Sequence, residues 1–116
     1  MRKIVILIRS PPHGAANLGE GIRAAIALPD KDIETTIVLM GDAVFAALKG
    51  QVTDAIGATS LDEPILKAKE FGARLVVHME SLQQRGIGKE ELLEVETVGT
   101  EEIAQLAHEA DTTITF

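Results

Sequence analysis

Short apolar runs alternate with segments of helical periodicity along the chain. Most of these runs are continuous and rich in Ile and Val, which is typical of parallel strands covered on both faces. Five strands are predicted, at residues 4–8, 35–40, 74–78, 94–98 and 112–116. The last of them alternates polar and apolar residues, so we expect it at or near an edge of the sheet.

Segments with a 3–4 residue apolar spacing separate the strands. Helices are predicted at 15–28, 43–49, 60–71, 80–85 and 101–110, with a further turn at 89–93. Asp42 and Thr100 stand where a side chain caps the following helix, and Arg85 stands where a cation neutralises a helix end. The alternation predicts an α/β protein of one domain, 1–116, with a three-layer α/β/α sandwich around a mostly parallel five-stranded sheet.

Composition and charge exclude several functions. The sequence has no Cys, which rules out disulfides, zinc thiolates and persulfide transfer by this chain. The net charge of −7 and the 3% aromatic content oppose nucleic-acid binding, and the charge also opposes binding to anionic membranes. Apolar runs are too short for a membrane span or a signal peptide, so we expect a cytoplasmic protein.

Polar side chains gather where three of the predicted strands end. In an open α/β sheet this edge is where ligands bind. His78 and Glu80 are the candidate acid/base groups. The candidate binding residues are Ser10, His13, Asp42, His78, Ser81 and Arg85. Each also has a structural interpretation, such as a helix cap for Asp42 or a hydrogen-bonded histidine for His78.

No set of residues for a named reaction is complete. Two histidines and two carboxylates near one edge lack a metal-ligand spacing. A Ser10–His13–Asp42 triad lacks the G-x-S-x-G elbow that presents a nucleophilic serine. The loop 9–14 has one glycine and no P-loop lysine, so it is no phosphate loop. We therefore predict neither a cofactor nor a metal.

Several motifs give the chain a family resemblance. They are the 4–8 strand, Ser10 to Ala16 with Pro12-His13-Gly14, Gly19-Glu20-Gly21, Gly41 to Phe45 with Leu48, Gly50 and Gln51, Glu80-Ser81-Leu82, Arg85-Gly86-Ile87 and 111–116. With these, the chain resembles the DsrE/DsrF/DsrH (TusBCD) sulfur-relay proteins, and among them the DsrF/TusC branch.

The resemblance implies a cytoplasmic five-stranded subunit of a trimer or hexamer. In such complexes a DsrE/TusD-type subunit carries sulfur on a cysteine as a persulfide, toward tRNA thiolation or sulfur oxidation. That cysteine lies at the end of strand three, eight residues before a glycine, and here His78 lies eight before Gly86. Imidazole cannot replace a thiolate, so we expect no sulfur carriage by this subunit.

Two hypotheses follow. In the first, the chain is a structural or interaction subunit that binds further copies of itself or DsrE- and DsrH-like subunits, and His78 raises the thiolate fraction of a partner's cysteine. In the second, it is a stand-alone small-molecule-binding protein or enzyme that uses His78, His13 and Glu80 as acid/base or ligand-binding groups. The incomplete nucleophile and metal sets favour the first.

Overall fold

The protein contains a five-stranded sheet in which every strand pair is parallel. The computed structural model describes residues 2–9, 33–48, 72–92 and 95–116. The strands are β1 (Arg2–Ile8), β2 (Ile33–Leu39), β3 (Arg74–His78), β4 (Glu96–Val98) and β5 (Thr112–Thr115), in the order β4-β3-β2-β1-β5. All five predicted strands are thus confirmed, and β5 lies at an edge as expected.

Two 3₁₀ helices and two α-helices lie between the strands in the described part. They are η1 (Gly41–Ala47), α3 (Met79–Gln84), η3 (Lys89–Glu91) and α4 (Thr100–Glu109). The helix predicted at 43–49 is therefore η1, which begins two residues earlier at Gly41, whose φ of +57° allows the sharp turn out of β2. The predicted helices 15–28 and 60–71 fall outside the described residues.

Both predicted caps are wrong. The N-cap of η1 is Met40 and that of α4 is Gly99, and neither helix has a side-chain cap. The side chains of Asp42 and Thr100 instead bond residues distant in sequence: Asp42 accepts from Arg85, and Thr100 donates to Glu80. These longer-range bonds replace the local ones because the ends of neighbouring strands bring the partners together.

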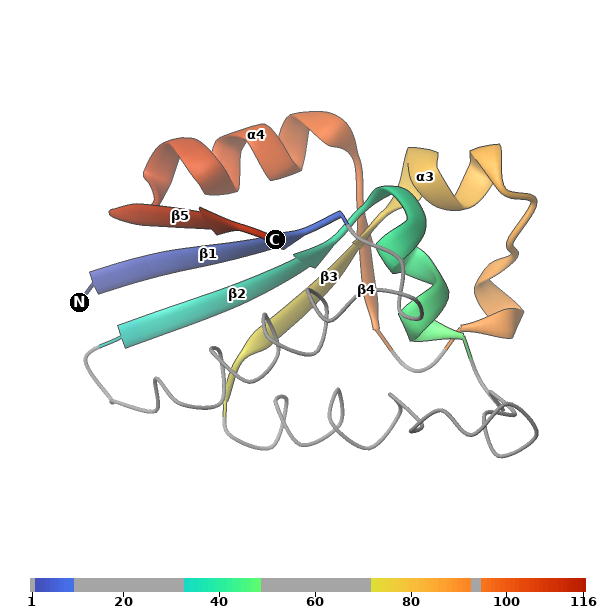
Figure 1. Cartoon of the computed structure of the whole chain (residues 1–116), viewed down its shortest axis with the longest axis horizontal. Helices are drawn as coiled ribbons and strands as arrows, with labels where there is room; N and C mark the ends of the chain where they lie inside the picture. The colour runs from blue at the N-terminus through green and yellow to red at the C-terminus, as the bar shows by residue number, and fades with distance from the viewer. Residues whose placement is uncertain (1, 10–32, 49–71, 93–94) are drawn as a thin grey trace.

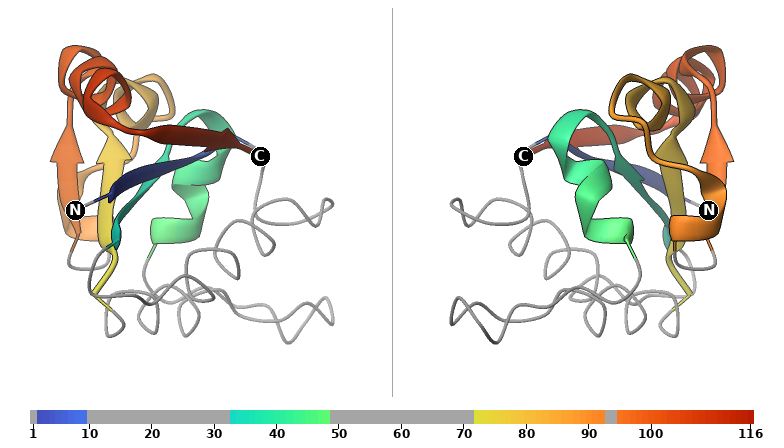
Figure 2. Two further views of the ribbon diagram at one scale, coloured as in Figure 1. Left: turned by 90° about the vertical axis from the view of Figure 1, so that its left-hand side faces the viewer. Right: turned by 90° about the vertical axis from the view of Figure 1, so that its right-hand side faces the viewer.

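Helices cover both faces of the sheet, as Figure 1 and the end-on views of Figure 2 show. On one face, α4 packs through Ile103 and Leu106 against a row of valines. On the other, η1 and α3 pack on the isoleucines and leucines of β1, β2 and β3. The three-layer α/β/α prediction is confirmed. None of the described helices is long and apolar enough to cross a membrane.

The 3₁₀ form of η1 suits its close approach to the sheet. Ala43, Val44, Ala46 and Ala47 are all fully buried. With three residues per turn, residues three apart are stacked, so these small side chains form one face. This face fixes η1, and with it Gly41 and Asp42, beside the carboxyl ends of β2 and β3.

Candidate functional site

The turn from β3 into α3 builds the centre of the site. His78 is the last residue of β3 and the N-cap of α3, with only 8% of the residue exposed. Ser81 is the third residue of α3, and side chains at the N-cap and three residues later lie close together. The imidazole therefore folds back over the first turn of the helix, and His78 Nδ1 lies 2.6 Å from Ser81 Oγ.

Both ring nitrogens of His78 are engaged within the chain. On one side, Ser81 Oγ also accepts the backbone N–H of Gly41 at 2.9 Å. On the other side, His78 Nε2 lies 2.7 Å from Thr100 Oγ1 and 3.2 Å from Glu80 Oε2. The ring thus joins the start of η1, the first turn of α3 and the first residue of α4.

The partners of the imidazole determine where its protons lie. Thr100 donates its hydroxyl proton to Glu80 Oε2, so Thr100 Oγ1 is an acceptor toward the ring. His78 Nε2 therefore carries a proton. In the neutral imidazole Nδ1 is then the acceptor, and Ser81 donates its hydroxyl to it. Gly41, Ser81, His78, Thr100 and Glu80 form one continuous chain of hydrogen bonds, which we call the His78 network.

Glu80 is held as a carboxylate at the end of this network. The hydroxyl and the backbone N–H of Thr100 both donate to it, the latter at 2.8 Å, and these bonds lower the pKa of Glu80 below its ordinary value of 4.5, with a smaller contribution from His78. A general acid at neutral pH needs the opposite shift. Glu80 is therefore suited to accepting hydrogen bonds and unsuited to delivering a proton.

The lowered pKa of Glu80 predicts how stability depends on pH. Because the folded protein favours the carboxylate, Glu80 stabilises it fully above about pH 5, and this contribution is lost as the pH falls through the lowered pKa. We expect the difference in free energy of unfolding between the native protein and Glu80→Gln to shrink over that interval. Urea denaturation at several pH values measures it, and a difference independent of pH would contradict the assignment.

Arg85 connects the site to η1. Its Nη2 and Nε donate to Asp42 Oδ1 at 2.9 and 3.2 Å. Its Nη1 donates to the backbone oxygen of Ser81 at 3.1 Å, which confirms that Arg85 neutralises the carbonyl end of α3. The Asp42 side chain is 56% exposed, so this ion pair orients the two elements more than it stabilises them.

Five of the predicted site residues meet at one edge of the sheet: Asp42, His78, Glu80, Ser81 and Arg85. Ser10 and His13 lie outside the described residues, as does any triad built on them. The sequence pattern did not identify Thr100 as a site residue. Its signal was available, since Thr100 closely follows the fourth predicted strand. Within the described ranges, no three His, Asp or Glu side chains cluster as metal ligands would.

Known proteins resemble the chain over its whole length. Residues 2–116 match the model of the DsrE/DsrF-like family. The TusC homolog of Vibrio vulnificus strain CMCP6 is 31% identical over 119 residues, and YchN of Escherichia coli K12 is 33% identical over 119, both with full coverage of each chain. The DsrF protein of Allochromatium vinosum, described as an intracellular sulfur oxidation protein, is 21% identical over 132 residues, which cover all of this chain and 97% of DsrF.

Solved structures agree with the sequence relatives. The crystal structure of ychN from E. coli superposes with a TM-score of 0.90 at 29% identity, over all of both chains. This superposition and the full-length sequence matches lead to one conclusion. The chain belongs to the DsrE/DsrF-like family.

Proposed function

We propose that this chain is a TusC/DsrF-like subunit of a cytoplasmic sulfur-relay complex, with an interaction role and no sulfur cargo of its own. One observation carries the proposal. At the strand end where the relay cysteine is expected stands His78, and both of its ring nitrogens are bonded within the chain. The absence of cysteine from the sequence leaves the chain no thiol to form a persulfide.

The His78 network supports a positioning role over an acid/base role. A general base needs a free lone pair within reach of its substrate. The Nδ1 lone pair of the neutral ring is taken by Ser81, and the Nε2 proton is taken by Thr100. The same bonds leave the ring poorly placed to activate a partner's thiol. His78 then serves to hold α3, η1 and α4 in a fixed relation at the edge that a partner subunit contacts.

The assembly state tests this role. We expect the purified 12.4 kDa chain to form a trimer or hexamer, or to co-purify with co-expressed DsrE-like and DsrH-like chains, when its mass is measured by native mass spectrometry. Glu80→Gln loosens the network and should reduce recovery of the complex. Glu34→Gln makes the same chemical change at the amino end of β2 and should leave recovery unchanged.

Two results would contradict the proposal. A monomer that carries a small molecule, and that binds no relative, would favour a stand-alone binding protein or enzyme. Equal recovery of the complex with Glu80→Gln and Glu34→Gln would show that assembly does not depend on the His78 network.

A further inference from the structure

A second polar region lies at the opposite end of the strands from His78. Alternate residues of a strand share a face. The face that carries the valines under α4 therefore also carries residues two or four positions earlier in the same strands. There, charged side chains of opposite sign follow one another across the sheet. They are Lys3 in β1, Glu34 in β2, Arg74 in β3 and Glu96 in β4.

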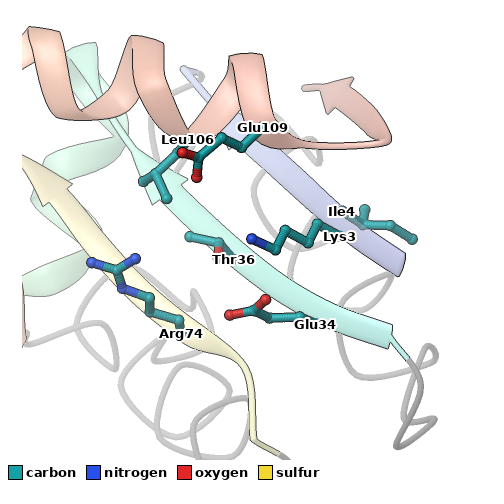
Figure 3. A pocket seen from close by; sticks show the side chains of 7 residues that line it. All are labelled: Lys3, Ile4, Glu34, Thr36, Arg74, Leu106 and Glu109. Atoms are coloured by element: carbon teal, nitrogen blue, oxygen red, sulfur yellow. The ribbon is translucent and has the colours of Figure 1, made fainter. Parts of the chain in front are cut away.

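These charges surround a hollow of about 100 Å³ between the sheet and the last turn of α4. Figure 3 shows the Lys3 side chain reaching toward Thr36, with Glu34 and Arg74 on the sheet beside it and Glu109 next to Leu106 on α4. Leu106 contributes an apolar wall. A hollow of this size has room for several waters, and therefore for a small organic molecule.

The hydroxyl of Thr36 is the observation that points to a ligand. Thr36 lines the hollow and is only 6% exposed. Among the described residues its hydroxyl has no hydrogen-bond partner. Buried polar side chains nearly always have one, from the protein, from water or from a ligand. The Thr36 hydroxyl can donate one hydrogen bond and accept others.

The charged side chains that line the hollow are of both signs. Arg74 is occupied by Glu96, with Nε–Oε1 and Nη2–Oε2 distances of 3.0 and 2.9 Å. Within the described residues the Lys3 ammonium has no ion-pair partner. Glu109 accepts a hydrogen bond from Gln105 Nε2 at 2.7 Å through Oε1. It lies in the last turn of α4, where its charge meets the negative end of the helix and a cation would be favourable. The hollow is therefore complementary to a molecule with one negative and one positive pole.

We propose that this hollow binds a small α-amino acid. Its carboxylate faces Lys3, its ammonium faces Glu34 and Glu109, and Thr36 donates to or accepts from one of the two poles. A simple anion would meet two carboxylates, and a simple amine would meet Lys3 and Arg74, so neither pole alone satisfies the site. The strand β3 runs from Arg74 to His78, which separates this hollow from the His78 network.

Titration of the ¹⁵N-labelled full chain tests the proposal. Alanine is the probe, and acetate and methylammonium are its two single-pole controls. We expect saturable shifts of the Lys3, Glu34 and Thr36 amide signals with alanine only. Shifts that do not saturate, or equal shifts with acetate or methylammonium, would overturn the proposal and leave the hollow as a hydrated polar corner.

Two variants locate the binding. Thr36→Val keeps the shape of the side chain and removes its hydroxyl, so alanine should bind about threefold to tenfold more weakly. Loss of an unpartnered buried hydroxyl should also raise the melting temperature of the ligand-free protein. Lys3→Gln should weaken binding similarly, while Lys89→Gln on the exposed η3 should not. Unchanged binding in both Thr36→Val and Lys3→Gln would overturn the assignment.

Discussion

Replacement of Ile37 by alanine is expected to lower the free energy of unfolding by about 3–4 kcal/mol. Ile37 lies in β2, which pairs with both β1 and β3, and its residue exposure is 0%. The side chain belongs to the core on the face that η1 covers. Its truncation removes three buried carbons and leaves a cavity that flanking strands cannot close.

Ile114→Ala is the matched control for this substitution. Ile114 has the same side chain, but it is half-buried in the edge strand β5, which pairs only with β1 in the described sheet. Its truncation should cost about 1 kcal/mol, because solvent already reaches the side chain and neighbours can adjust. Chemical denaturation measures both losses. Equal losses would contradict the central position of β2 in the core.

The strands could be predicted because a strand buried on both faces has a continuous run of apolar residues. β1 and β3 are continuous apolar runs, and the predicted and observed bounds of β3 agree at Arg74–His78. The order of the strands has no such pattern in the sequence. It depends on α4, which crosses the sheet from β4 at one edge to β5 at the other. The residue pattern of a strand indicates that the strand is buried, but it does not indicate which strands lie beside it.

The residues of the site could be predicted from the sequence, but the hydrogen bonds between them could not. Parallel strands end at one edge, so Asp42, His78 and Ser81 had to lie near each other. Their partners are set by tertiary contacts. Gly41 bonds Ser81 across 40 residues and Arg85 bonds Asp42 across 43. Both cap predictions are wrong for the same reason. A cap is predicted from the helix that follows the residue, and local sequence does not show partners that are distant along the chain.

Thr100 illustrates why the hydrogen bonds of the His78 network could not be predicted from the sequence. A threonine ahead of a helix favours a cap whenever only local sequence is considered. Here β4 lies beside β3, so the first residue of α4 comes within 2.7 Å of His78. There the Glu80 carboxylate accepts from both the hydroxyl and the backbone N–H of Thr100. Hydrogen bonds to a charged acceptor are stronger than the bonds between neutral groups that a local cap would make.

A double-mutant cycle on His78 and Ser81 is the second large expected effect. His78→Leu fills a similar volume but removes the acceptor of the buried Ser81 hydroxyl, and should cost about 1–3 kcal/mol. Ser81→Ala removes the partner of Nδ1 and the acceptor of the Gly41 N–H, with a loss of similar size. The two losses share one hydrogen bond, so the double variant should lose about 1–2 kcal/mol less than their sum.

Gln105 and Glu109 provide the comparison cycle. Their side chains are exposed on α4 and bond at 2.7 Å, and a pair of this kind couples by less than about 0.5 kcal/mol. If His78 and Ser81 coupled as weakly, the ring would have a free nitrogen, and acid/base chemistry at the strand end would become the better explanation. Strong coupling would show instead that the imidazole is committed to its own chain. Strong coupling would therefore support the proposed interaction role of this chain over an acid/base role for His78.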